Sequence, residues 1–267
     1  MTSVRILGVR VDDVTLDGAA EAVLARVRVA REGPARETRQ EATSERAARR
    51  LWVLSTPNPE MIMTARARPD LAAILDQADL AVPDGVGLLW AARRQGTPLR
   101  ERVAGCDLLG RILERGAGEK LRVFFLGAAP GVAEEAARRC RETYPGLEIA
   151  GTHHGYFGAS EDRQVAGRVA RSGAEFVAVG MGSPRQERWV QAARAALEGP
   201  ESRVAVAMPV GGSLDVLSGR RKRAPDWASR LGLEWLVRLL SQPARWRRAP
   251  TLVRFVLAVL RERTCPS

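Results

Sequence analysis

From Leu51 onward the chain alternates short apolar runs with longer amphipathic stretches, and this alternation constrains the fold more than any other feature. Apolar runs bounded by turn residues are typical of strands buried on both faces. Strands that alternate with helices form a parallel sheet covered on both sides. The sequence therefore predicts an α/β fold with a Rossmann-like parallel sheet core. The expected strands are Leu51–Ser55, Leu80–Val82, Arg122–Leu126, Phe176–Val179 and Val204–Val210.

A turn rich in Gly, Pro, Asn or Asp follows each expected strand. These turns are TPNPE from Thr56, PDGVG from Pro83, GAAPG from Gly127, GMGSPRQE from Gly180 and GGSLD from Gly211. In an open α/β sheet, ligands bind beyond the carboxyl ends of the strands, where such turns gather. We therefore expect the functional residues to converge on one crevice at that edge.

The chain before Leu51 has a different pattern. It predicts a short extended piece around residues 6–11 and then a helix that carries Ala19, Val23 and Val27. Residues 31–50 contain almost no large apolar side chain, which indicates a flexible surface insertion. We expect an α/β core over residues 1–219 and a basic helical appendage over residues 220–267.

The composition is that of a compact soluble protein, with 45% hydrophobic and 27% charged residues. No apolar run approaches the ~18 residues that a membrane span requires. The start, MTSVRILGVRVDD, has no apolar signal core, so the sequence predicts a cytoplasmic protein.

Most of the net charge of +11 lies in the tail, where residues 220–267 hold 12 basic and 3 acidic residues. Apolar residues at helical spacing predict two helices there, over 227–240 and 251–263. A concentrated cationic surface attracts anionic lipid, phosphorylated ligands or nucleic acid. Nucleic acid is the least favoured partner, because Trp227 and Trp235 fall on an apolar helix face rather than where bases could stack.

Three arginines of the tail, Arg238, Arg245 and Arg248, allow two interpretations. They could converge on a diphosphate, because a guanidinium donates bidentate, permanently charged hydrogen bonds to phosphate oxygens. They could equally form a solvated basic face that touches anionic lipid without specificity. A lipid-linked diphosphate substrate would satisfy both.

Asp84 follows an expected strand and stands between Pro83 and Gly85. A carboxylate held at the carboxyl end of a strand can act as a general base toward a hydroxyl group. It could equally cap the helix expected to begin near Val86. Gly85 would let a substrate approach the backbone closely.

Thr56 and Asn58 follow the first expected strand, and Pro59 is placed to open a helix. Asn58 then fits the cap position of that helix. The polar pair could equally bind a sugar hydroxyl or a pyrophosphate oxygen.

The turns GAAPG and GMGSP place glycines between a strand and a helix, which suits phosphate binding by free backbone amides. Neither matches the dinucleotide or P-loop fingerprint, so each pattern alone is weak. Gln186 and Glu187 fall in the first turn of the second of these helices, where Glu187 favours the helix dipole.

Neither a metal site nor a cofactor is indicated. His153 and His154 are adjacent in GTHHGYF, and no His or Cys stands at metal-ligand spacing, so we expect a structured loop there. Cys106, Cys140 and Cys265 are few and far apart, which predicts reduced thiols rather than a disulfide framework.

Eight blocks, in order, resemble the WecG/TagA/CpsF family of bacterial glycosyltransferases. They are TPNPEMIMTARARPDL, ADLAVPDGVGLLWAARRQG, RVAGCDLL, VFFLGAAPGVAEEAA, YPGLEIAGTHHGYF, VGMGSPRQERWV, VGGSLDVLSGRRKRAPDW and LGLEWLVRLLSQPARWRR. The blocks run from about Leu51 to Arg248, and the ordered set is far more specific than any single block. The family usually reads P-K-Q-E where this chain has Pro184-Arg185-Gln186-Glu187, a change that keeps the charge.

The resemblance implies an inverting, metal-independent transfer of a sugar, typically N-acetylmannosamine or its uronic acid, from a UDP-sugar. The acceptor would be an undecaprenyl-diphosphate-linked N-acetylglucosamine, and the products would feed wall teichoic acid, enterobacterial common antigen or exopolysaccharide synthesis. The resemblance also implies that the C-terminal appendage closes over the site and contacts the inner face of the cell membrane. It makes Asp84 the general base. It also implies substrate-binding roles for Thr56, Asn58, Gln186, Arg238, Arg245 and Arg248. With these we expect Gly85, Arg102 and Asp107 to bind substrate.

A different class of function also fits the pattern, namely a nucleotide-binding module that docks at the membrane through its basic tail without catalysis. Asp84 and the second glycine turn favour an enzyme, because a docking module needs neither. A nucleic-acid-binding protein is the least favoured, because the core is nearly neutral. The donor sugar, the acceptor and the oligomeric state stay open, a homo-oligomer included.

Overall fold

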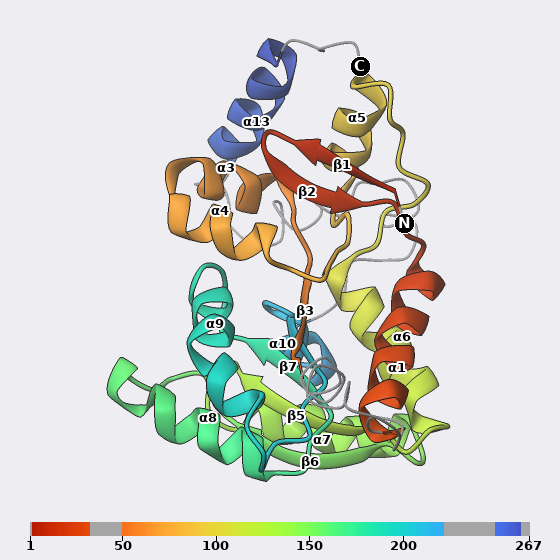
Figure 1. The fold of residues 1–267 in the computed structure, drawn as a ribbon, viewed down its shortest axis with the longest axis vertical. Helices are drawn as coiled ribbons and strands as arrows, with labels where there is room; N and C mark the ends of the chain where they lie inside the picture. The colour runs from red at the N-terminus through yellow and green to blue at the C-terminus, as the bar shows by residue number, and fades with distance from the viewer. Residues whose placement is uncertain (1, 33–49, 222–248, 263–267) are drawn as a thin grey trace, which may run out of the picture.

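The computed structural model describes residues 2–32, 50–221 and 249–262, and its centre is a six-stranded parallel sheet (Figure 1). The strands lie in the order β4-β3-β8-β7-β5-β6, and every neighbouring pair is parallel. This confirms the predicted α/β fold. The strands are β3 (Trp52–Ser55), β4 (Leu80–Ala81), β5 (Arg122–Gly127), β6 (Glu148–His153), β7 (Phe176–Gly180) and β8 (Val206–Pro209).

All five strands expected from the sequence are present, with ends that differ by one or two residues. The sixth, β6, was not expected. It lies at the edge of the sheet, and none of its residues is fully buried. Its sequence, EIAGTH, has only one large apolar residue, so the continuous apolar run that identifies the other strands is absent from it.

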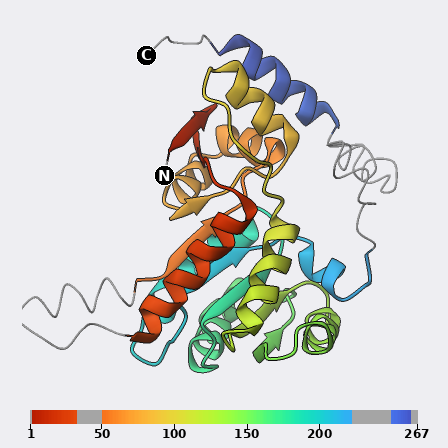
Figure 2. The ribbon, with the colours of Figure 1, turned by 90° about the vertical axis from the view of Figure 1, so that its right-hand side faces the viewer.

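Helices cover both faces of the sheet (Figures 1 and 2). Along β7, Phe176 and Ala178 join one apolar cluster while Val177 and Val179 join the other, as the two-residue period of a strand requires. Helices α1 (Leu16–Glu32), α6 (Gly105–Ala117) and α7 (Val132–Thr143) contribute to the first cluster. Helices α8 (Asp162–Arg171), preceded by the short helix η1 (Ala159–Glu161), and α9 (Arg185–Leu197) contribute to the second.

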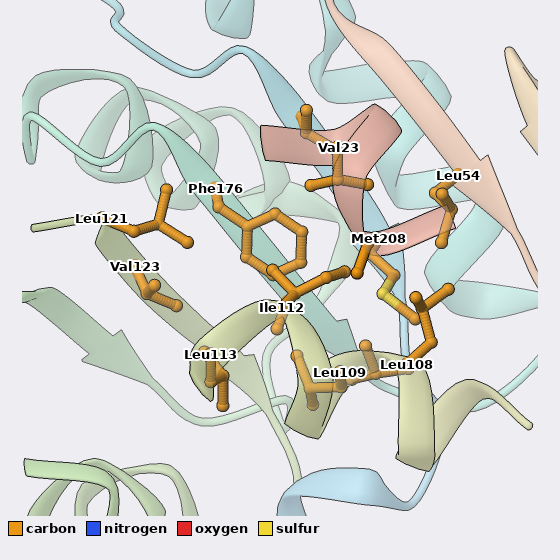
Figure 3. Packing of buried hydrophobic residues seen from close by; sticks show 14 of the residues in the cluster. Val23, Leu54, Leu108, Leu109, Ile112, Leu113, Leu121, Val123, Phe176 and Met208 are labelled. Carbon is orange, nitrogen blue, oxygen red and sulfur yellow. The ribbon is translucent and has the colours of Figure 1, made fainter. Parts of the chain in front are cut away.

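The first cluster is the larger, and Figure 3 shows its packing. Phe176 of β7 lies between Val23 of α1 and Ile112 of α6, and all three side chains are fully buried. Each such side chain contributes about 1.5–3 kcal/mol by leaving water. Cys140 belongs to the same cluster as a free thiol, and burial raises its pKa to about 11. These contacts fix the helices that position the turns at the edge of the sheet.

A smaller lobe stands beyond the carboxyl ends of β3 and β4, because the helices that follow these strands belong to it (Figure 1). The lobe has its own apolar core, which includes Ile6, Val11, Ile62 and Phe255. It consists of the antiparallel strands β1 (Ser3–Ile6) and β2 (Val9–Asp12) and the helices α3 (Pro59–Ala67), α4 (Pro69–Asp76), α5 (Val86–Arg94) and α13 (Ala249–Arg261).

The N-terminal segment corrects one expectation. A single extended piece over residues 6–11 is wrong, because the chain reverses at Leu7 and Gly8 to form the β1–β2 hairpin. Both turn residues have positive φ, 50° and 89°. The turn was missed because a leucine is rarely found in the left-handed region, which favours Gly, Asn or Asp.

Helix α1 reaches Glu32, so Arg31 and Glu32 are helical although the sequence placed them in the polar insertion. The rest of that stretch, residues 33–49, lies outside the described residues. The tail helix expected over 251–263 is confirmed as α13, whereas the one expected over 227–240 lies outside the described residues, as do Arg238, Arg245 and Arg248. A short helix, α10 (Ser213–Leu217), follows β8.

Candidate active site

The turns after β3 and β4 are joined to each other by backbone hydrogen bonds. The amide of Asp84 donates to the carbonyl of Pro57 at 3.0 Å, and the amide of Val82 donates to Ser55 at 2.9 Å. The amide of Val103 donates to Pro83 at 2.9 Å, which brings in the segment before α6. Three segments that are distant in sequence therefore meet at one edge of the sheet, at its junction with the lobe.

Asp84 is half-buried in this junction. The cap position of α5 is occupied by Gly85, not by Asp84, so the structure does not support the capping role for the aspartate. Gly85 has a φ of 117°, a conformation that only glycine adopts without strain. A side chain on this residue would therefore disturb the turn that holds the carboxylate.

Thr56 and Asn58 lie on the facing turn. Asn58 caps α3 as predicted: its Oδ1 accepts a hydrogen bond from the Met61 amide at 3.0 Å, and Pro59 is the first helical residue. Thr56 lies against the start of α6, since a Cβ at Gly105 would come within 3.2 Å of the threonine Cγ2. Glycine at position 105 thus lets α6 begin directly beside Thr56.

Arg102 and Asp107 flank the same helix start. The Arg102 guanidinium and the Asp107 carboxylate form a loose ion pair at 3.9 Å, and their side chains are 16% and 22% exposed. Asp107 lies in the first turn of α6, where a carboxylate complements the helix dipole. The structure thus brings five of the described candidates together with Asp84 or close beside it: Thr56, Asn58, Gly85, Arg102 and Asp107.

Gln186, in the first turn of α9, contacts the turns that follow β7 and β8, the two strands next to β3 in the sheet. It is 5% exposed. Its Oε1 accepts hydrogen bonds from the amides of Gly182 at 3.2 Å and Gly211 at 3.0 Å, and its Nε2 donates to Glu187 at 2.8 Å. These hydrogen bonds join the Gln186 side chain to the two turns and to its neighbour Glu187.

Glu187 is a polar residue whose place the sequence reasoning missed. It was assigned only to the helix dipole, but it is 3% exposed. Burial raises the pKa of its carboxyl group, and the hydrogen bond from Gln186 is the main effect that opposes that rise. A signal was present, because Glu187 falls at helical spacing with the apolar Val190 and Leu197 on the buried face of α9.

The GAAPG turn touches the neighbouring turn through its backbone. The Ala128 amide donates to the Gly180 carbonyl at 2.8 Å, and a Cβ at Gly127 would lie 2.3 Å from the same oxygen. Gly131, with a φ of 81°, is the cap of α7, and the Arg220 guanidinium lies 3.7 Å from where its Cβ would be. A positive side chain therefore stands beside a helix start that no side chain caps.

His153 and His154 lie at the end of β6 in an ordered arrangement. His153 Nδ1 is 2.7 Å from the His154 carbonyl oxygen, and the Tyr156 amide donates to His154 Nδ1 at 3.3 Å. The predicted structured loop thus begins at His154, because His153 is the last residue of β6. Arg185 of α9 stacks over the Phe157 ring at 5.1 Å. Within the described ranges, no three His, Cys, Asp or Glu side chains are grouped as metal ligands, and no helix is long and apolar enough to span a membrane.

A carboxylate, a hydroxyl group, an amide and an arginine lie beside glycine turns at the ends of parallel strands, where an open α/β sheet binds its ligands. Comparison with known proteins identifies the family of the chain. The glycosyl transferase WecG/TagA/CpsF family matches residues 4–267, and the chain belongs to this family. The protein is accordingly a hexosyltransferase, and membership of an enzyme family disfavours the non-catalytic docking module.

Two curated relatives illustrate the likeness, both named N-acetylglucosaminyldiphosphoundecaprenol N-acetyl-beta-D-mannosaminyltransferase. The relative from Bacillus spizizenii (strain ATCC 23059 / NRRL B-14472 / W23) is 42% identical over 206 residues, which cover 77% of each chain. The relative from Bacillus subtilis (strain 168) is 36% identical over 211 residues, which cover 79% of each chain.

Proposed function

We propose that the protein transfers an N-acetyl-β-D-mannosaminyl unit from its UDP-sugar to N-acetylglucosaminyldiphosphoundecaprenol, in the synthesis of a cell-surface polysaccharide. The names of the two relatives support the transferred unit and the acceptor. The observation that carries the catalytic part is the position of Asp84. It is a half-buried carboxylate at the end of β4, held to the facing turn by its backbone and not used as the helix cap.

Asp84 is the general base of this proposal. Its carboxylate accepts the proton of the acceptor hydroxyl group as that oxygen bonds to the anomeric carbon of the donor. The bond from that carbon to the UDP oxygen breaks, and UDP leaves with the electron pair. UDP-hexosamines carry an α-linked diphosphate, so formation of a β-mannosaminide by one displacement inverts the anomeric carbon.

The proposed reaction uses protein cations rather than a metal ion to stabilise the leaving diphosphate. Arginine suits this role because it keeps its charge and binds phosphate oxygens in a bidentate manner. Arg220 supports the idea by its place beside the uncapped start of α7. The arginines Arg238, Arg245 and Arg248, which the family resemblance implies, would add to this charge.

Peripheral contact with an anionic membrane is part of the proposal and rests on α13. This helix buries Phe255 and Val259 in the lobe, while Val256, Leu257 and Leu260 are 40–46% exposed. An amphipathic helix with basic residues and exposed large apolar side chains is suited to lie in the interface of a lipid bilayer. A second copy of the chain is the competing occupant of this face, and it would show itself as a homo-oligomer in solution.

Asp84→Asn tests the base. The variant should bind UDP with a dissociation constant within about threefold of the wild type, because the amide keeps the shape of the carboxylate. Its turnover should fall by about 10²-fold or more, as expected when a general base is lost. Asp162→Asn on α8, far along the chain from the site residues, is the matched control and should leave both quantities unchanged.

The assay is UDP release from a panel of UDP-sugars with and without a short-chain lipid-diphosphate N-acetylglucosamine acceptor, repeated in EDTA. Acceptor-dependent release from UDP-N-acetylmannosamine that persists in EDTA is the expected result. Full activity of Asp84→Asn would remove Asp84 from the mechanism. Loss of release in EDTA would refute the metal-independent part alone.

A further inference from the structure

The first turn of α9 contains a buried pair of polar side chains that joins two glycine turns. Gln186 Oε1 accepts from the Gly182 amide, in the turn after β7, and from the Gly211 amide, in the turn after β8. The two turns are in contact, since a Cβ at Gly180 would lie 2.8 Å from the Gly211 carbonyl oxygen. One side-chain oxygen thus holds both turns at a fixed separation.

The orientation of the Gln186 amide decides whether this clamp works. With the oxygen toward the two turns it accepts two N–H groups, but with the NH₂ group turned toward them donors would face donors. Glu187 indicates the orientation, because its carboxyl Oε1 accepts a hydrogen bond from Gln186 Nε2 at 2.8 Å, and only the amide nitrogen can donate there. The carboxylate therefore keeps the amide oxygen on the side of the glycines.

Burial of the Glu187 carboxyl group opposes folding. Its side chain is 3% exposed, and its Oε2 is buried with no hydrogen-bond partner. A buried carboxyl oxygen without a partner loses its hydration with no compensation. An apolar residue would avoid that penalty but would leave Nε2 of the buried Gln186 without its acceptor, so the cost of Glu187 is tied to holding this amide.

We propose that Glu187 is a positioning residue that acts through Gln186 to keep the turns after β7 and β8 in the geometry that binds the diphosphate of the donor. This role rests on the proposed function, because it assumes a nucleotide-diphosphate donor. Glycines in these turns suit close approach of phosphate oxygens to backbone amides. In this proposal Glu187 contacts Gln186 and does not touch the substrate.

The test compares Glu187→Ala with Glu187→Gln. The alanine variant removes the acceptor, so the donor KM and the dissociation constant of UDP should rise about tenfold, the effect expected from losing one or two hydrogen bonds. The KM for the acceptor should not change. The glutamine variant keeps a carbonyl oxygen for Gln186 and should return the donor KM to within about threefold of the wild type.

The matched control is Glu175→Gln. Glu175 is equally buried, at 3% exposure, but it precedes β7 at the opposite, amino end of the strands. This variant should lower stability and leave the donor KM unchanged. Should Glu187→Ala fail to fold, Glu187→Asp serves instead, because its carboxylate is one methylene group too short to reach the amide.

Amide hydrogen exchange at Gly182 and Gly211 gives a readout that needs no activity. Both amides should exchange faster in Glu187→Ala than in the wild type, whereas Glu175→Gln should speed them no more than it speeds the amides of the sheet. Unchanged exchange together with donor affinity within twofold of the wild type would overturn the positioning role. Faster exchange in a protein whose wild type neither binds UDP nor releases it would instead refute the proposed function while the clamp itself stood.

Discussion

Replacing Glu175 with glutamine tests how much one buried ion pair holds this fold together. The Glu175 carboxylate accepts hydrogen bonds from Nε and a terminal nitrogen of Arg31, both at 2.7 Å, and from the Arg122 backbone amide at 3.1 Å. It thereby ties the end of α1 to the start of β5 and β7. Hydrogen bonds to charged groups contribute about 1.5–3 kcal/mol each, and removing one partner of a buried pair costs about 3–5 kcal/mol.

The cost of Glu175→Gln should lie below that range, at about 2–3 kcal/mol. The side chains of Arg31 and Arg122 are 34% and 30% exposed, so water can solvate them after the carboxylate is lost. The glutamine oxygen also keeps one of the hydrogen bonds. With a urea dependence of about 3 kcal/mol per M for a chain of this size, the unfolding midpoint should fall by roughly 1 M.

Urea unfolding followed by circular dichroism measures this shift, and Glu135→Gln on α7 is the control. Glu135 also pairs with two arginines, Arg138 and Arg139, and hydrogen bonding to Arg138 is the main cause that lowers its pKa to about 2. Because that pair is in solvent, its loss should leave the midpoint unchanged within error. An equal shift in the two variants would refute the argument that burial makes the Glu175 pair valuable.

The stability that the Glu175 carboxylate contributes should depend on pH. Burial alone would raise the pKa of Glu175, but hydrogen bonds from Arg31 and from the Arg122 backbone lower it below the value of an unfolded chain. A carboxylate with a lowered pKa adds stability above about pH 4.3, and that stability is lost as the pH falls through the folded-state pKa. The gap between the wild type and Glu175→Gln should therefore narrow below about pH 4.

Two further changes probe the junction and the tail. Asn58→Ala removes the side-chain cap of α3 and should cost about 1 kcal/mol in urea unfolding, whereas Asn58→Ser should recover most of it; equal stability of the alanine and serine variants would contradict the cap. Leu257→Glu places a charge on the exposed face of α13 and should weaken cosedimentation with phosphatidylglycerol vesicles several-fold, while Arg171→Glu on α8 should not. Unchanged vesicle binding together with loss of a dimer in Leu257→Glu would assign that face to a second copy of the chain.

The sheet could be predicted from the sequence because its inner strands are buried on both faces. Such strands are continuous apolar runs, and the glycines and prolines after them mark where they end. The edge strand β6 and the hairpin at Leu7 lack these signals, since the first is half exposed and the second uses a leucine where glycine is usual. The lobe could not be predicted, because it pairs residues near both ends of the described chain.

In the candidate site too, residues with local sequence signals could be predicted, and residues that depend on tertiary packing could not. Asp84 and Asn58 could be placed from turn chemistry alone, because strand ends and helix caps are local features of the sequence. The burial of Gln186 and Glu187 depends on how two distant turns pack against each other. Spacing along α9 could have placed Glu187 on the apolar face, but only the tertiary structure shows that its partner Gln186 holds Gly182 and Gly211.

The lobe also has a consequence for the order in which the protein can be made. Its core combines Ile6 and Val11, near the start of the described chain, with Phe255 and Val259, near its end. Synthesis proceeds from the N-terminus, and domains tend to fold as they emerge. The sheet and its covering helices can therefore form on the ribosome, whereas the lobe keeps apolar surface in contact with water until α13 is released. Chaperones that bind nascent chains should find their target on this lobe, beside the turn that carries Asp84.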